Sequence, residues 1–415
     1  MDSAVAMPNL TVDGDRLWQS LMETAQIGGT QKGGIKRLPL TEEDRAVRDW
    51  LVRQCEALGC RTAIDEVGNM FFTRPGTDPA LDPIAIGSHL DTQPTGGKFD
   101  GILGVLAGLE ILRSLSESGY ATRHPLMLVN WTNEEGARFS PAMLGSGVHA
   151  GVFDRAYADA RTAADGVTFG DALDAIGYRG ETPAGSTKIA AMLELHIEQG
   201  PVLERHGKDI GIVEGVQSMR WYDLVITGVE AHAGSTPMDA RLDALVAAAE
   251  LVLLVERIAK SHASAVGTVG CLAVHPSSRN VVPGQISMTV DLRHPEDCQL
   301  EIMEATLRRE IHARFDGRLT CSLSEIWRSP AVKFDGRCID AVASGAATAG
   351  YSSLRLHSGA GHDSAYIARV APTSMIFIPC LDGLSHNEAE SSTKEQCQAG
   401  AQTLLNAVLM LDNSL

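Results

Sequence analysis

Apolar positions in the first half of the chain form short unbroken runs instead of alternating with polar ones. The runs lie in PIAIGSH, PLMLVNWT and MLELHIE, and longer helical patterns separate them, such as GILGVLAGLEILRSL. Strands that are apolar on both faces are typical of a parallel sheet covered by helices on both sides. The pattern therefore predicts an α/β domain with a doubly wound, mostly parallel sheet.

The pattern changes at about residue 215. From there it predicts a strand, a helix, two strands, a helix and a strand, which is the order of a small ferredoxin-like α+β domain. We expect its helices over about 239–261 and near 297–315. In the strand ISMTVDLR apolar residues alternate with polar ones, so one face of this sheet packs into a core and the other is polar.

An inserted domain is the simplest arrangement. Residues 1–214 and 330–415 form a discontinuous catalytic domain in this interpretation, and residues 215–329 form the insertion. The chain has 415 residues, more than one compact core usually holds, which supports two domains. The strand and helix alternation resumes after about residue 330, so we expect the C-terminal segment to complete the first sheet.

Net charge, cysteine spacing and the N-terminal sequence argue against several classes of function. The formal net charge of −17 repels phosphate backbones and anionic lipids, which argues against nucleic acid or a membrane as a partner. The 8 cysteines show no paired spacing, so neither a disulfide framework nor a zinc ribbon is predicted. The N-terminal residues lack the basic and apolar regions of a signal peptide, and no apolar run is long enough to span a bilayer. We therefore expect a cytoplasmic enzyme or binding protein.

The stretch GSHLDTQPTGGKFDG, residues 87–101, places three polar side chains after an apolar strand. His89 and Asp91 lie at the carboxyl end of that strand, where open α/β sheets bind their ligands, and Asp100 comes at the start of the next helix. Asp91 is too near His89 to share a metal with it easily, but its carboxylate can accept the second imidazole N–H. A helix-capping aspartate beside a loop histidine is the alternative, and this stretch alone leaves both open.

Two further strands end in side chains of the same kind. Glu134 and Glu135 are adjacent after one strand, where their charges repel unless a cation or a proton separates their roles. The alternative is a solvated acidic turn. This alternative is weakened by His196, because a third strand then also ends in a possible metal ligand. Imidazole and carboxylate ligands suit zinc, manganese or nickel in an open, catalytic site. The C-terminal segment adds His362 and His386 in loops.

Eight motifs together resemble the hydantoinase/carbamoylase branch of the M20 metallopeptidase family. In chain order they are GSHLDTQPTGGKFDGILGVLAGLE, NEEGARF, LELHIEQGP, GVEAHAGSTPM, RNVVPG, DLRHP, SGAGHDS and DGLSHN. They run from residue 87 to residue 387 in the order of the family. Within the branch they are most similar to enzymes that hydrolyse N-carbamoyl-β-alanine and N-carbamoyl-L-amino acids.

The resemblance implies two divalent ions per subunit, Zn²⁺, Mn²⁺, Co²⁺ or Ni²⁺. The implied ligands are His89, Asp100 and His196 for one ion and Asp100, Glu135 and His386 for the other. Glu134 is then the general base and acid, and Asp91 orients the first histidine. His196 stands where peptidase members have an acidic residue, which favours amide or ureide hydrolysis over peptide cleavage. For His362 and Asp363 two roles stay open, support of the metal loop and direct binding of an ion.

By the same resemblance, the inserted domain is a lid and a dimerisation domain. His232 is expected to stabilise the oxyanion in the active site of the partner subunit of a homodimer. Asn280 and Arg293 are expected to hold the substrate carboxylate, and Gln199 to contact the ureido group. Independently, Arg293 lies on the polar face of its strand, and a guanidinium grips a carboxylate with two hydrogen bonds. A solvent-exposed arginine is the alternative for this position.

The expected reaction is hydrolysis of the ureido C–N bond of an N-carbamoyl amino acid to the amino acid, carbon dioxide and ammonia. A β- and an α-amino acid differ here by one methylene, worth only about 1–3 kcal/mol of discrimination, so both stay open. Allantoate or ureidoglycolate hydrolysis is the nearest alternative, followed by an aminoacylase or dipeptidase. The last alternative is a metal-binding scaffold without catalytic activity. Glu134 argues against this alternative, because a structural metal site needs no base that is free of the metal.

Overall fold

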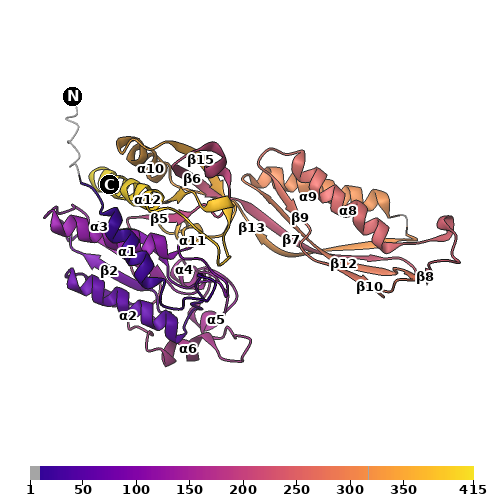
Figure 1. Cartoon of the computed structure of the whole chain (residues 1–415), viewed down its shortest axis with the longest axis horizontal. Helices are drawn as coiled ribbons and strands as arrows, with labels where there is room; N and C mark the ends of the chain where they lie inside the picture. Colours follow the sequence, from indigo (N-terminus) through magenta and orange to yellow (C-terminus); the bar gives the residue numbers. More distant parts are fainter. Residues whose placement is uncertain (1–9, 316) are drawn as a thin grey trace. The chain divides into compact units, whose positions relative to one another are not determined.

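The computed structural model describes residues 10–315 and 317–415 (Figure 1). It divides into two compact units, Met1–Glu214 with Lys333–Leu415, and Gly215–Val332. The expectation about a signal peptide rests partly on residues 1–9, which lie outside the described residues, so the cytoplasmic location stays a prediction. Within the described residues no helix is both long and apolar enough to cross a bilayer.

The larger unit is built on a nine-stranded sheet with the order β1-β2-β4-β3-β5-β16-β6-β14, in which β15 also pairs with β6. The strands are β1 (Arg61–Ile64), β2 (Met70–Arg74), β3 (Ile84–His89), β4 (Leu126–Trp131), β5 (Ala191–Ile197), β6 (Ile210–Val216), β14 (Val332–Lys333), β15 (Ser353–Ser358) and β16 (Thr373–Ile378). The four central strands β4, β3, β5 and β16 are parallel and buried at every position. The mostly parallel sheet expected from the apolar runs is confirmed, and antiparallel strands extend it on both sides.

Helices cover both faces of this sheet. They are α1 (Gly14–Thr24), α2 (Glu42–Ala57), α3 (Ile102–Glu117), α4 (Leu144–His149), α5 (Arg155–Asp159), α6 (Phe169–Ala175), α7 (Val202–His206), α10 (Gly336–Thr348), α11 (Asp363–Ile367) and α12 (Lys394–Ser414), with a 3-10 turn η2 (Leu381–Gly383). Helices α3 and α12 pack on the central strands and on each other, and α11 packs on β5 and β16 together with α4. At Gly108 of α3 the absence of a side chain makes room for Leu128 of β4.

The smaller unit holds an antiparallel sheet with the order β10-β12-β7-β13, and β9 pairs with the other end of β12. Its elements are β7 (Ser218–Thr227), β8 (Ala231–His232), η1 (Met238–Ala240), α8 (Ala244–Lys260), β9 (Val266–Thr268), β10 (Leu272–His275), β11 (Val281–Val282), β12 (Gln285–His294), α9 (Asp297–Arg314) and β13 (Thr320–Ser329). Helices α8 and α9 lie side by side over one face (Figure 1). They bury the apolar residues of β12, Ile286, Met288, Val290 and Leu292, and so confirm the alternation predicted for this strand.

The first helix of this unit begins later than the sequence pattern predicted. The expected start was about residue 239, but residues 238–240 form a separate 3-10 turn and α8 begins at Ala244. The reason is the cap: the Asp243 carboxylate accepts hydrogen bonds from the backbone N–H of Leu245 at 2.9 Å and of Val246 at 3.2 Å.

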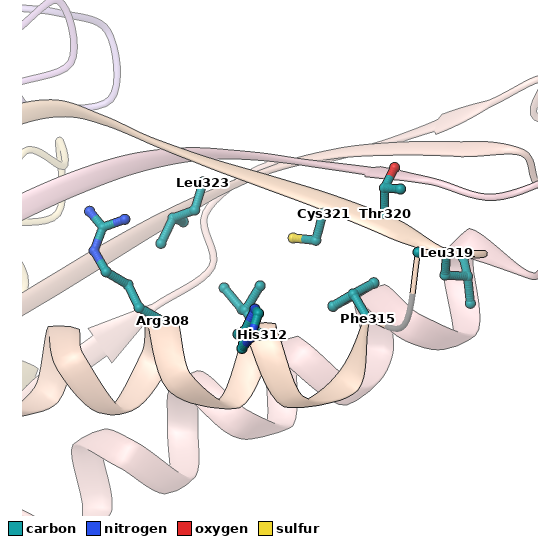
Figure 2. A pocket seen from close by; sticks show the side chains of 9 residues that line it. Arg308, His312, Phe315, Leu319, Thr320, Cys321 and Leu323 are labelled. Atoms are coloured by element: carbon teal, nitrogen blue, oxygen red, sulfur yellow. The ribbon is translucent and has the colours of Figure 1, made fainter.

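A surface pocket of about 400 Å³ lies between the last turns of α9 and the start of β13 (Figure 2). Arg308, His312 and Phe315 line it from the helix side, and Cys321 and Leu323 from the strand. No residue of its lining belongs to the site predicted from the sequence, so this pocket is not part of that site.

Candidate metal centre

Three neighbouring parallel strands end at one edge of the larger sheet. His89 is the last residue of β3, His196 is the last but one of β5, and Glu134 lies in the turn that follows β4. Because β4, β3 and β5 are adjacent and parallel, the polar residues after each strand converge, as expected for the ligand edge of an open α/β sheet.

The first group of ligand atoms belongs to His89, Asp100 and His196, all of which are buried. The Asp100 Oδ1 atom lies 3.1 Å from His196 Nε2 and 3.7 Å from His89 Nε2. Within the described residues the Nε2 atom of His89 is buried and has no hydrogen-bond partner. A desolvated imidazole nitrogen that faces carboxylates is a suitable donor for a metal ion.

Both histidines are held in the tautomer that a metal ligand needs. Nδ1 of His89 lies 2.9 Å from the backbone oxygen of Asp91, and Nδ1 of His196 lies 2.9 Å from that of Ile197. A carbonyl only accepts, so each Nδ1 carries a proton and each Nε2 is the ring atom left for a metal ion, although the Nε2 of His196 also lies 3.2 Å from the backbone N–H of Gly101.

The second group joins Asp100 to Glu135 and His386. The Nε2 atom of His386 lies 3.5 Å from Asp100 Oδ2 and 3.3 Å from Glu135 Oε2. Asp100 thus presents Oδ1 to the first group and Oδ2 to the second. His386 differs from the other members because its side chain is 50% exposed and its backbone has a φ of 53°.

Glu134 belongs to neither group, although it is buried beside them. Its Oε2 atom lies 3.4 Å from His89 Nε2. Burial, and then the charges of Asp363 and Glu135, raise the pKa of Glu134 well above its ordinary value. A carboxyl group with this environment is suited to accept and return a proton.

Asp91 does not orient His89 in the manner predicted. Its backbone oxygen, and not its carboxylate, contacts the imidazole. The carboxylate instead accepts hydrogen bonds from the backbone N–H groups of Glu134 and Glu135, each at 3.2 Å. The chain turns after β3, which directs this side chain towards the loop after β4, so Asp91 fixes the two glutamates as well as the histidine.

The charges of the cluster favour a cation at its centre. Burial of Asp100 opposes its ionisation, but the hydrogen bond with His196 lowers its pKa below the ordinary value. Burial acts against protonation of His196, yet its hydrogen bond with Asp100 raises the pKa to about 9. The hydrogen bond between Glu135 and His386 likewise raises the pKa of that imidazole to about 9. When His196 or His386 is protonated, the second proton lies on the Nε2 atom that would bind a metal ion, so binding of an ion there would release that proton.

Three residues that the sequence analysis did not identify hold the ligands in place. The Gln93 side-chain amide donates to Glu135 Oε2 at 2.8 Å. The Ser385 hydroxyl donates to Asp100 Oδ2 at 3.0 Å, and Glu390 accepts from the backbone N–H of Asp100 at 3.0 Å. Gln93 lies within the GSHLDTQPTGGKFDG motif and Ser385 within DGLSHN, so the motifs contained a signal for two of them.

The predicted substrate residues fall on both units. Gln199 lies beside both ligand groups, because its side-chain amide donates to Asp100 Oδ2 at 3.0 Å. His232 and Asn280 lie in the smaller unit on the β8–β11 ribbon, where the N–H of Ala233 donates to the backbone oxygen of Asn280 at 2.9 Å. The Nδ1 atom of His232 accepts from Gly234 N–H at 3.0 Å, so the exposed ring carries its proton on Nε2.

Arg293 lies on the face of the smaller sheet opposite α8 and α9, as the strand pattern predicted. Its guanidinium forms an ion pair with Asp291 at 2.7 Å, two residues earlier on the same strand. A substrate carboxylate bound at Arg293 would therefore compete with Asp291.

His362 and Asp363 lie next to the cluster but outside both ligand groups. The His362 ring packs on the His196 ring, with centroids 4.6 Å apart, and its Nε2 atom is 3.0 Å from the Ser358 hydroxyl. Asp363 is buried and accepts a hydrogen bond from Ser146. These contacts agree with a supporting position for both residues.

Comparison with known proteins gives one consistent result. Residues 85–410 match the model of Peptidase family M20/M25/M40. An N-carbamoyl-L-amino-acid amidohydrolase of Rhizobium meliloti is 48% identical over 404 residues, 97% of each chain. A ureidoglycolate hydrolase of Arabidopsis thaliana is 32% identical, over 95% of this chain and 86% of its own. The solved structure of a hydantoinase/carbamoylase family amidase from Burkholderia multivorans is 51% identical and superposes with a TM-score of 0.95, covering 97% of this chain and 98% of its own.

Proposed function

We propose, since the chain belongs to Peptidase family M20/M25/M40, that it is a metal-dependent amidohydrolase which cleaves the ureido C–N bond of N-carbamoyl amino acids. The products are the free amino acid, carbon dioxide and ammonia. The observation that carries the proposal is Asp100, which presents one oxygen to each of two ligand groups while the buried Glu134 stays outside both.

The proposed centre takes two divalent ions per subunit. His89 and His196 would hold one ion and Glu135 and His386 the other, and Asp100 would be shared between the two. Imidazole and carboxylate donors without thiolates suit Zn²⁺, Mn²⁺, Co²⁺ or Ni²⁺, and this donor set alone does not select among them. When bound, such ions lower the pKa of a water molecule and polarise the substrate carbonyl.

Proton transfer is assigned to Glu134. It accepts the proton of the attacking water and returns it to the nitrogen of the leaving amine. Burial raises the pKa of Glu134, so its carboxylate holds a proton more strongly than a solvated carboxylate does. His232 donates its Nε2 proton in a hydrogen bond to the oxyanion that develops on the ureido carbonyl.

Substrate recognition is assigned to residues of both units. Gln199 contacts the ureido group from its position beside Asp100. Asn280 and Arg293 hold the substrate carboxylate, and this binding frees Arg293 from its pairing with Asp291. We further propose a homodimer in which the His232 of one subunit serves the metal centre of its partner.

Hydrolysis of ureidoglycolate or allantoate is the second candidate function. It is favoured by the similarity to a ureidoglycolate hydrolase over nearly the whole of this chain, at the lower identity of 32%. The two candidates share the metal centre and the proton transfer, and they differ only in the group that the substrate pocket accepts.

A substrate panel decides between these candidates. The metal-free chain is loaded in turn with Zn²⁺, Mn²⁺, Co²⁺ and Ni²⁺ and incubated with N-carbamoyl-L-amino acids, N-carbamoyl-β-alanine, allantoate and ureidoglycolate. Released ammonia and primary amine are measured, and we expect the N-carbamoyl amino acids to be the best substrates. N-acetyl amino acids and dipeptides serve as controls, and hydrolysis confined to these controls would contradict the proposal.

A further inference from the structure

Glu390 is a buried acid in the loop that also carries His386. Its side chain is 4% exposed, and its Oε1 atom accepts hydrogen bonds from two backbone N–H groups, those of Phe99 at 3.1 Å and Asp100 at 3.0 Å. Glu390 belongs to neither ligand group. Its carboxylate therefore holds the backbone of the bridging residue without contributing a ligand atom.

The second oxygen of the same carboxylate faces the His386 side of the cluster. Glu390 Oε2 is 3.2 Å from the hydroxyl of Ser385, the residue before His386. The Ser385 hydroxyl in turn lies 3.0 Å from Asp100 Oδ2. One side chain thus fastens together two loops whose residues Asp100 and Glu390 are 290 positions apart in the chain.

The chain leaves space for this contact at Gly97. A Cβ atom at that position would overlap the carboxyl group of Glu390. Only a residue without a side chain lets the carboxylate reach the N–H groups of Phe99 and Asp100.

His386 needs such support more than the other ligands do. It is half exposed, and its backbone lies in the left-handed region with a φ of 53°, a conformation that non-glycine residues adopt at a cost. His89 and His196, by contrast, lie on central strands of the sheet and are buried.

We propose that Glu390 is a positioning residue that fixes Asp100 against His386 and thereby sets the affinity of the ion shared by Asp100, Glu135 and His386. The inference rests on the proposed two-ion centre and deepens it. Groups that orient metal ligands without touching the metal commonly change its affinity about 10- to 100-fold when they are removed.

The test is a calorimetric titration of the metal-free chain with Zn²⁺ or Mn²⁺, which measures binding separately from turnover. We expect the wild-type chain to bind two ions. Glu390→Ala is expected to weaken binding of the ion at Asp100, Glu135 and His386 by about 10- to 100-fold. The affinity for the ion at His89, Asp100 and His196 should fall by less. Glu390→Gln is expected to restore most of the affinity, because its amide oxygen still accepts both backbone N–H groups.

Two further variants make the result specific. Glu388→Gln is the matched control: this acid lies in the same loop but contacts Thr30 and Lys32, so both affinities should be unchanged. Gly97→Ala displaces the Glu390 carboxylate without removing it and should reproduce the Glu390→Ala result.

The outcomes separate the two proposals. If Glu390→Ala and Gly97→Ala both bind two ions with wild-type affinity, the positioning role is wrong while the two-ion centre stands. If Glu390→Ala does not fold, as judged by circular dichroism, Gly97→Ala decides alone. A folded wild-type chain that binds fewer than two ions would contradict the centre itself, and this inference with it.

Discussion

At the scale of single residues, Glu134 offers the sharpest test of the chemistry. Because it lies outside both ligand groups, Glu134→Gln should leave the number of bound ions unchanged while lowering kcat by about 10²- to 10⁴-fold, the usual contribution of a general base. Metal content by elemental analysis and turnover of the best substrate are measured on the same preparation. Activity near that of the wild type would refute the assignment of the base.

Alanine substitutions at Gly101 and Gly119 distinguish a disturbed metal ligand from backbone strain alone. The φ of Gly101 is 68° with a ψ of −56°, outside the left-handed helical region, and a Cβ atom there would overlap the His89 ring, so Gly101→Ala should weaken binding of the ion that His89 holds. Gly119 has nearly the same φ, 66°, and open space around its Cβ position. Gly119→Ala should therefore lower stability by about 1 kcal/mol, the cost of the left-handed backbone, without changing metal binding. Equal metal affinity in the two variants, measured by titration, would argue against His89 as a ligand.

The sequence identified these ligands because each one follows an apolar strand or lies in a motif of the family. It did not predict which atom of Asp91 faces His89, because that depends on how the chain turns after β3. It also missed Glu390, whose partners lie about 290 positions away and become neighbours only when the C-terminal segment packs on the loop before α3.

At the scale of elements, the start of α8 depends on the capping side chain of Asp243. Asp243→Ala removes the side chain that caps two N–H groups and should lower stability by about 1 kcal/mol, whereas Asp243→Asn should keep most of it. Asp239→Ala is the control, since that residue lies in the preceding 3-10 turn. Chemical denaturation of the three variants measures the difference. A larger loss from Asp239→Ala would support the earlier start predicted from the apolar pattern.

The central strands were predictable and the outer ones were not. Strands β3, β4, β5 and β16 are buried on both faces, so each appears in the sequence as a continuous apolar run. The outer strands β1 and β15 are only partly buried, and they leave no such run. The place of β15 is decided by hydrogen bonding to β6, far away in the chain, which local sequence does not encode, whereas β1 pairs with the neighbouring strand β2.

At the scale of the whole molecule, the proposed homodimer predicts rescue between inactive chains. A His232→Ala chain keeps its metal centre and a Glu134→Gln chain keeps its His232, so a mixed dimer has one complete site. After subunit exchange at equal amounts, half of the dimers are mixed, and about a quarter of the wild-type activity should return. Each variant alone is the control. No rescue, with exchange demonstrated by a differential tag, would mean that His232 acts within its own chain.

The position of β16 has a consequence for how the chain is made. β16 lies between β5 and β6, parallel to one and antiparallel to the other, yet it is synthesised last of the three. Until residues 373–378 emerge from the ribosome, β5 is an open edge strand, a form prone to pairing with the wrong partner. The smaller unit, residues 215–332, is then already synthesised in full and can fold as a unit before the larger one is complete. We therefore expect a chain that ends before β16 to expose the edge of β5, the strand that carries His196, and to aggregate more readily than the full chain.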